Sequence, residues 1–242
     1  MLEFENAIAA AEQDMGCKGI GTLGEKSLHL ALKYYFAPDP DTHERQVGGF
    51  VADAVTEAGI IEVQTRGLSR LKPKLDAFLP ICPVTVVHPV ITDKLLLRVD
   101  ENGELLSQRK SPKHETVYSA MREIYTLRDY LEHPHFSLCI CELELAEYSV
   151  QHGRSRREKL DRVPLALCGA RRLETPADYA ALLPDALAEP FTVPETAALL
   201  HTTELSARLF LNLLHRMGIV AEAGRNGRLK CWKRTGFCDI RR

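Results

Sequence analysis

The chain has 242 residues, of which 45% are hydrophobic and 26% are charged, with a formal net charge of −2. This composition is typical of a soluble globular protein with one sizeable core and a small second domain, and it gives no reason to expect disorder. Neither a signal peptide nor an apolar run long enough to span a membrane is present, so we expect a cytoplasmic protein that does not associate with membranes. The seven cysteines lack metal-ligand spacing and predict buried thiols.

The small net charge hides a division along the chain. Residues 1–150 contain 15 Lys and Arg against 23 Asp and Glu, whereas residues 190–242 contain 9 against 4. The acidic half argues against a broad nucleic-acid surface there, although local acidity suits a metal site. Contact with phosphate is expected in the basic C-terminal segment.

The first chemically informative element is an amphipathic helix that begins near residue 24. Glu25 and His29 are spaced i, i+4 and therefore lie on the same side of this helix. For His29, a place on the helix surface or at the edge of the core is favoured over a role as a metal ligand.

A hairpin follows, with predicted strands at 50–55 and 60–65. Side chains alternate between the two faces of a strand, so Glu62 and Gln64 point the same way. The short turn around Gly59 brings Asp53 beside Glu62. Two carboxylates this close repel each other unless a cation lies between them, and oxygen ligands suit Mg²⁺ or Mn²⁺. The alternative interpretation is the solvated polar face of an ordinary hairpin.

A helix over 69–79 and a buried strand over 84–90 come next, which completes an α-β-β-β-α-β order. Over about residues 20–90 this order, with Asp on one strand and E-x-Q on the next, resembles the PD-(D/E)XK nuclease superfamily. The resemblance implies an α/β fold, with a restriction-endonuclease-like mixed sheet flanked by helices, and metal-dependent hydrolysis of DNA phosphodiesters. It further implies that Mg or Mn is held by Asp53, Glu62, the Val63 carbonyl and Glu25.

Gln64 departs from the family pattern, which has Lys at this position. A Lys ammonium stabilises charge on the phosphate and lowers the pKa of the attacking water, whereas an amide can only orient the water. The candidate substitutes are Lys74, Lys26, Lys33 and Arg66. Without a substitute, the chain would be a catalytically inactive DNA-binding or regulatory protein on a nuclease scaffold. If the fold were an unrelated α/β fold, Asp53 and Glu62 would lie far apart.

The sequence of the middle of the chain predicts further strands and one long helix. Strands are expected at 94–100 and 105–108, a helix at 116–131, and a long hairpin at 136–150 and 163–172 that carries the basic loop 154–159. Two prolines then mark a linker over 184–190.

Residues 191–236 resemble a winged helix-turn-helix domain. Helices are expected at 194–200 and 204–217, capped by Thr192 and Thr203, and a hairpin with Asn226-Gly227 at its tip would form the wing. The resemblance implies DNA contact by the second helix and the wing, at Arg208, Arg225, Arg228, Lys230 and Lys233. The alternative is a winged helix used for protein contact or dimerisation.

The sequence therefore predicts a nuclease-like domain at 1–183, a linker at 184–190 and a winged helix at 191–236. DNA is the expected partner, and a homodimer is left open because nucleases of this fold often pair to cut both strands.

Overall fold

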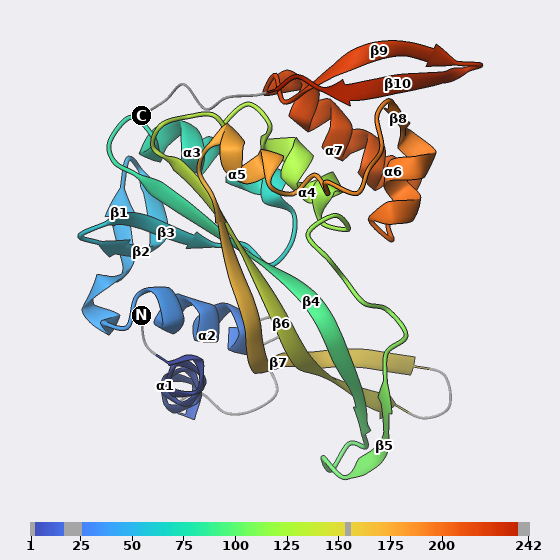
Figure 1. The fold of residues 1–242 in the computed structure, drawn as a ribbon. Coiled ribbons are helices and arrows are strands. Elements are labelled where there is room, and N and C mark those ends of the chain that lie inside the picture. Colours follow the sequence, from blue (N-terminus) through green and yellow to red (C-terminus); the bar gives the residue numbers. More distant parts are fainter. Residues whose placement is uncertain (1–2, 17–25, 153–155, 237–242) are drawn as a thin grey trace.

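The computed structural model describes residues 3–16, 26–152 and 156–236 (Figure 1). The elements in chain order are α1 (Phe4–Gly16), α2 (Lys26–Phe36), η1 (Pro40–Thr42), β1 (His43–Val47), β2 (Phe50–Thr56), β3 (Gly59–Val63), η2 (Leu68–Leu71), α3 (Lys72–Phe78), β4 (Val84–Val99), β5 (Leu105–Lys110), α4 (Met121–Ile124), η3 (Tyr125–Leu127), β6 (Phe136–His152), β7 (Arg156–Leu173), α5 (Pro176–Ala180), β8 (Phe191–Thr192), α6 (Val193–Leu199), α7 (Glu204–Arg216), β9 (Val220–Asn226) and β10 (Leu229–Arg234).

A seven-stranded mixed sheet forms the centre of the molecule, in the order β1-β2-β3-β4-β6-β7, with β5 paired to the far half of β4. Strands β1 to β3 form an antiparallel meander, and β4 then runs parallel to both β3 and β6. The expected α/β class, a mixed sheet flanked by helices, is confirmed. From α2 to β4 the order is α-β-β-β-α-β, as expected, although the position of its first strand, β1, was not located in the sequence.

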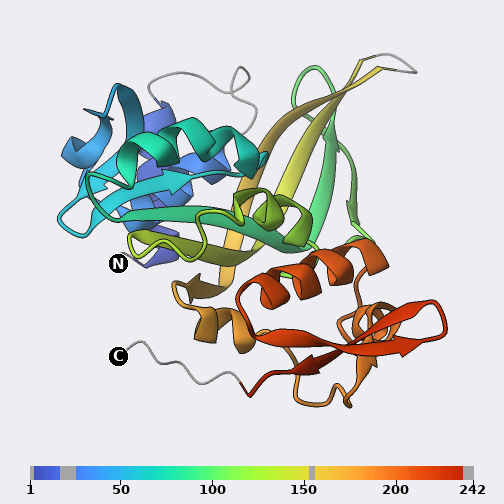
Figure 2. The ribbon, with the colours of Figure 1, turned by 90° about the horizontal axis from the view of Figure 1, so that it is seen from above.

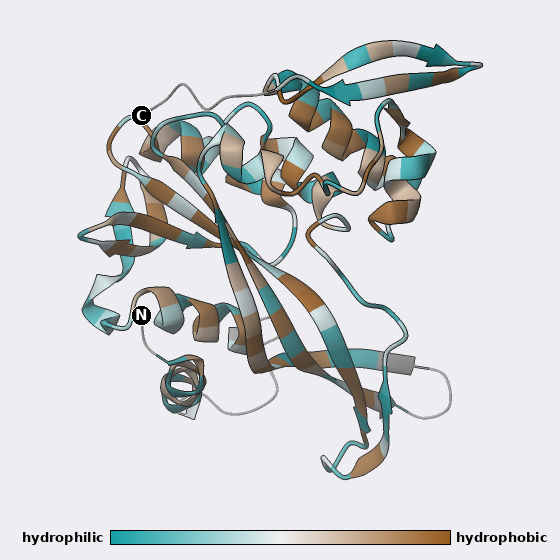
Figure 3. Ribbon diagram, in the orientation of Figure 1, coloured by the Kyte–Doolittle hydropathy of each residue, from teal (hydrophilic) through white to brown (hydrophobic). Residues whose placement is uncertain are grey.

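Strand β4 is one long strand where two separate strands were expected. Its register against β6 shifts between Ile91 and Asp93, so the chain bends there without leaving the sheet. The first half is buried on both faces, as its mostly apolar sequence predicts. The second half forms a ribbon with β5, β6 and β7 that extends beyond the helices (Figure 1), and hydrophilic and hydrophobic residues alternate along it (Figure 3).

Helices cover both faces of the sheet. On one face, Leu75 and Phe78 of α3 belong to the main core, together with side chains of α4, η3 and α7. On the other face, Leu28 and Leu32 of α2 pack on β4 and β6, and α1 packs against the outside of α2. The two layers therefore bring side chains to the sheet from opposite sides.

Two expectations for the middle of the chain are wrong. Only the short α4 and η3 form within 116–131, because Ser119 exchanges two hydrogen bonds with the backbone of Thr116 and Thr126 bonds to the carbonyl of Glu123, which competes with a continuous helix. The thiols of Cys139, Cys141 and Cys231 are buried as expected, but Cys168 is exposed.

The C-terminal unit contains the expected two helices and hairpin. Its three-stranded sheet has the order β8-β10-β9, and Thr192 and Thr203 cap α6 and α7 as expected. Helix α7 packs on α4 (Figure 2), and Phe210 and Trp232 belong to the same hydrophobic cluster as the main sheet. The guanidinium of Arg234 holds the expected linker by donating to the carbonyls of Pro184 and Leu187. The boundaries at 183 and 191 remain predictions.

No helix in the described part of the chain is long and apolar enough to cross a membrane.

Candidate active site

The two acidic residues meet where the β2–β3 hairpin opens. The last ladder pair is Ala54 with Ile61. Beyond it, the Asp53 N–H donates to Glu62 Oε1 at 3.2 Å, and the Val63 N–H donates to Asp53 Oδ2 at 2.8 Å. The carboxylates thus replace ladder hydrogen bonds between the diverging strands. Asp53 and Glu62 are neighbours, as the short turn predicts.

The neighbouring β3–β4 ladder ends two to three residues further along β3. The Gln64 N–H donates to the Val87 carbonyl at 2.9 Å, but the next position on β4 that faces β3 is Pro89, which has no N–H to continue the pairing. The ring Nδ1 of His88 lies 2.7 Å from the Gln64 carbonyl and satisfies it. Strand β3 therefore ends at Val63, and the acidic pair lies at the open end of the β2–β3 hairpin.

Among the candidate substitutes for the missing lysine, Lys74 contacts Glu62 of the acidic pair. Its Nζ lies 2.8 Å from Oε2 and 3.1 Å from Oε1 of Glu62. Lys33 is buried and its Nζ lies 3.4 Å from Glu44 Oε1, and Arg66 is exposed in the loop after β3. Glu25 and the side chain of Lys26 lie outside the described residues.

His29 also belongs to the site. Its Nε2 lies 3.2 Å from Asp53 Oδ2, and the ring is 31% exposed. The residue sits at the edge of the core, as expected, but its contact with Asp53 was not anticipated. The only signal in the sequence was that His29 lies on the same side of the first helix as Glu25.

These side chains surround a hollow of about 160 Å³, lined by His29, Asp53, Glu62, Val63, Gln64, Thr65 and Lys74. The amide of Gln64 is half-exposed, and its Nε2 donates to the Arg66 carbonyl, so it is turned toward its own loop. The hollow has an almost entirely polar lining.

The two carboxylates have opposite pKa shifts. Burial and the charge of Asp53 raise the pKa of Glu62 to about 7, although Lys74 opposes the rise. Burial acts in the same direction on Asp53, but its hydrogen bond and charge interaction with His29, together with the Val63 N–H and Lys74, hold its pKa below the usual range. Near neutral pH, Asp53 is therefore ionised while Glu62 exchanges a proton.

The donor set suits a hard divalent cation. No group of three His, Cys, Asp or Glu side chains with metal-site geometry occurs within the described ranges. Two carboxylates and the carbonyl of Val63 are nevertheless oxygen ligands of the kind Mg²⁺ prefers, and Mg²⁺ in enzymes often takes only one or two carboxylates, with water and phosphate oxygens completing its shell. The residues present therefore fit Mg²⁺ or Mn²⁺.

The residues nominated for DNA contact lie on the C-terminal unit. Arg208 is exposed on α7, whose opposite side is buried, and Arg225, Arg228 and Lys233 are exposed on the wing. Lys230 is also exposed, but its Nζ lies 2.5 Å from Glu222 Oε1 and 5.1 Å from the centre of the Trp232 ring.

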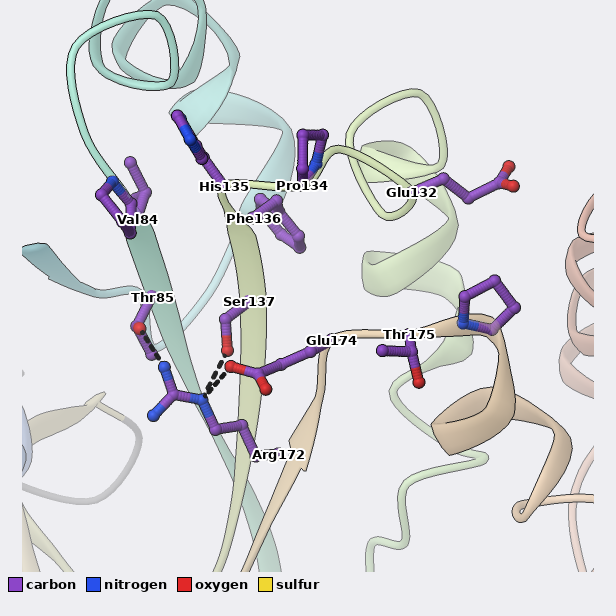
Figure 4. A pocket seen from close by; sticks show the side chains of 12 residues that line it. Val84, Thr85, Glu132, Pro134, His135, Phe136, Ser137, Arg172, Glu174 and Thr175 are labelled. Carbon is purple, nitrogen blue, oxygen red and sulfur yellow. Dashed lines mark hydrogen bonds and ion pairs between the residues drawn. The ribbon is translucent and has the colours of Figure 1, made fainter. Parts of the chain in front are cut away.

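A larger hollow of about 340 Å³ lies at the starts of β4 and β6. There the guanidinium of Arg172 reaches across the sheet to the hydroxyls of Ser137 (2.9 Å) and Thr85 (3.1 Å) and pairs with Glu174 at 2.6 Å (Figure 4). The acidic pair of the β2–β3 hairpin does not line this hollow.

Comparison with known proteins identifies a family but no activity. A protein of Treponema pallidum (strain Nichols), described as an uncharacterized protein, is 34% identical over 228 residues, which covers 92% of this chain and 90% of that protein. No solved structure matches the chain. The model of a domain of unknown function, DUF8091, matches residues 26–173, which include the whole acidic site and the central sheet. The chain therefore belongs to the DUF8091 family.

Proposed function

We propose that this protein is a metal-dependent deoxyribonuclease with a PD-(D/E)XK-like catalytic domain and a DNA-binding winged helix. One observation carries the proposal: Lys74 Nζ lies 2.8 Å from Oε2 of Glu62, which itself adjoins Asp53. An acid pair and a lysine thus meet at the open end of a hairpin, although the lysine comes from the following helix and not from the E-x-K position.

The arrangement of the strands supports the same function. The meander β1 to β3, the crossover through α3 and the parallel strand β4 follow the order expected for this nuclease core. The acidic pair lies beyond the last β2–β3 pair and within two residues of the last β3–β4 pair, so a phosphate could approach it without displacing a neighbouring strand.

Each residue has a distinct role in this proposal. Asp53, Glu62 and the Val63 carbonyl would hold Mg²⁺ or Mn²⁺, which when bound supplies Lewis acidity and neutralises charge at the phosphate. The hydrogen bond between His29 and Oδ2 of Asp53 lowers the pKa of that carboxyl and so favours its ionised form. Lys74 would transfer its hydrogen bonds from Glu62 to a phosphate oxygen, and Gln64 would orient the attacking water.

Cleavage assays test the proposal directly. Linear and supercoiled DNA are incubated with the protein in Mg²⁺, Mn²⁺ or EDTA, beside the variants Asp53→Asn and Lys74→Met. The control is Lys110→Met, which removes an exposed lysine from β5. We expect cleavage only with metal, lost in both site variants and retained in the control. Unchanged cleavage by Asp53→Asn would refute the assignment.

A second function is favoured by a specific observation. Both carboxylates already accept backbone N–H groups, and Lys74 neutralises Glu62, so the charges and hydrogen bonds of the site are satisfied without a metal. This favours a DNA-binding or regulatory protein that has kept the nuclease scaffold without its chemistry. Calorimetric titration with Mn²⁺ distinguishes the two functions. The nuclease requires Mn²⁺ binding that is lost in Asp53→Asn, whereas the regulatory protein does not require it.

A further inference from the structure

The segment that links β3 to α3 is strongly basic. Between Gln64 and Lys74 the sequence contains four cationic residues and no acid: Arg66, Arg70, Lys72 and Lys74. This segment lies in the acidic half of the chain, where Asp and Glu outnumber Lys and Arg. The segment begins at Gln64, which lines the hollow of the acidic site. Its positive charge therefore lies next to the place where a bound DNA backbone would pass.

Arg70 is placed against the loop that follows β3 by the fold of this segment. Leu68, Leu71 and Leu75 are buried on the inner side of η2 and α3, which leaves Arg70 outside. Gly67 has a φ of +66°, and a β-carbon added to it would lie 3.3 Å from Nε of Arg70. The guanidino group is therefore folded back over the loop whose first residue, Gln64, lines the hollow.

No group in the described part of the chain pairs with the Arg70 side chain, which is exposed. Several other cations of the protein are already paired, for example Lys74 with Glu62, Arg216 with Asp129, and Arg234 with Glu189. Arg70 lies in η2, four residues before Lys74 of α3. The guanidinium thus has its donors available beside Gly67, two residues after Thr65, which lines the hollow.

We propose that Arg70, lying in the space that Gly67 leaves, forms a phosphate-binding subsite for the DNA strand next to the scissile phosphate. The planar guanidinium offers parallel N–H donors that match two oxygens of a phosphodiester, and Gly67 leaves the space in which it lies. The inference rests on the proposed function, since it assigns the substrate of that site as a DNA backbone that crosses the loop at 64–67.

Binding measured without catalysis tests this subsite. The affinity of a fluorescein-labelled DNA duplex is determined by anisotropy in EDTA for wild type, Arg70→Glu and Arg70→Lys. The matched control is Arg109→Glu, an exposed arginine on β5. We expect Arg70→Glu to weaken binding at least tenfold and to reduce the slope of log K against log salt by about one, as for one lost phosphate contact. Arg70→Lys should weaken binding less, and the control by less than twofold.

Gly67→Ala provides a second, independent measurement. The added methyl group would push the guanidino group of Arg70 aside by a few tenths of an ångström, so Gly67→Ala should weaken binding in wild type more than in the Arg70→Ala background. Melting curves verify that each variant is folded.

The outcomes separate this proposal from the proposed function. If Arg70→Glu and the control bind DNA equally, or if wild type does not bind DNA, the subsite is refuted whatever the cleavage assays show. If binding depends on Arg70 while wild type cleaves no DNA in Mg²⁺ or Mn²⁺, the subsite stands and the nuclease assignment falls.

Discussion

Replacing Glu62 with Gln should stabilise the protein above neutral pH while removing the proposed metal site. The side chain of Glu62 is 2% exposed, and its pKa is raised from the ordinary value of 4.5 to about 7. Between these two values the folded state holds a proton that the unfolded state releases, so stability falls as pH rises through this window. The cost of the ionised group is about 1 kcal/mol at pH 5 and about 3 kcal/mol at pH 8.

The Glu62→Gln side chain would keep an amide oxygen for the Asp53 N–H but remove the pH-dependent cost. Because Lys74 loses a charged partner, the net gain at pH 8 should be about 1–2 kcal/mol. The difference in Tm between Glu62→Gln and wild type should therefore be greater at pH 8 than at pH 5 by roughly 4–8 °C for a chain of this length.

Thermal denaturation at pH 5 and pH 8 is the assay, with Glu57→Gln in the exposed β2–β3 turn as the control. At pH 8, Mg²⁺ should raise the Tm of wild type and of the control but not that of Glu62→Gln, because a ligand stabilises only the state that binds it. A Tm difference that is the same at both pH values would refute the reasoning from burial.

Three further predictions concern other parts of the molecule. His29→Gln should raise the pKa of Asp53 and shift the acid limb of metal binding to higher pH, measured by Mn²⁺ titration between pH 4 and 7; an unchanged profile would contradict the role given to the imidazole. Gly59→Ala should destabilise the fold by about 2 kcal/mol or more in urea titration, because its φ is +120° and the new β-carbon would lie 2.3 Å from a backbone oxygen before β4; a loss under about 0.5 kcal/mol would argue against this turn. Arg225→Glu with Arg228→Glu should reduce the salt slope of DNA binding by about two while leaving the Tm unchanged, and an unaltered slope would exclude the wing from the interface.

The sequence by itself determined the elements and contacts that depend on neighbouring residues. Alternation along a strand and the short turn at Gly59 were sufficient to bring Asp53 beside Glu62. The capping residues Thr192 and Thr203 were sufficient to start α6 and α7 at the expected positions. These features rest on interactions within about ten residues, which the order of side chains specifies directly.

Tertiary packing decided the rest of the site. Four cationic residues were equal candidates to replace the missing lysine, and only the crossover of α3 onto the sheet brings Lys74 to Glu62. His29 reaches Asp53 because α2 packs on the opposite face.

The other differences between expectation and structure also arise from interactions that sequence periodicity does not specify. The apolar residues of 116–131 have helical spacing and several are buried, but local hydrogen bonds break the helix. Strand β1 lacks the usual apolar alternation, since it is an exposed edge strand held chiefly by its pairing with β2. Periodicity indicates which side chains face a core. Which side chains from different layers meet depends on how those layers pack, and the packing is a property of the whole fold.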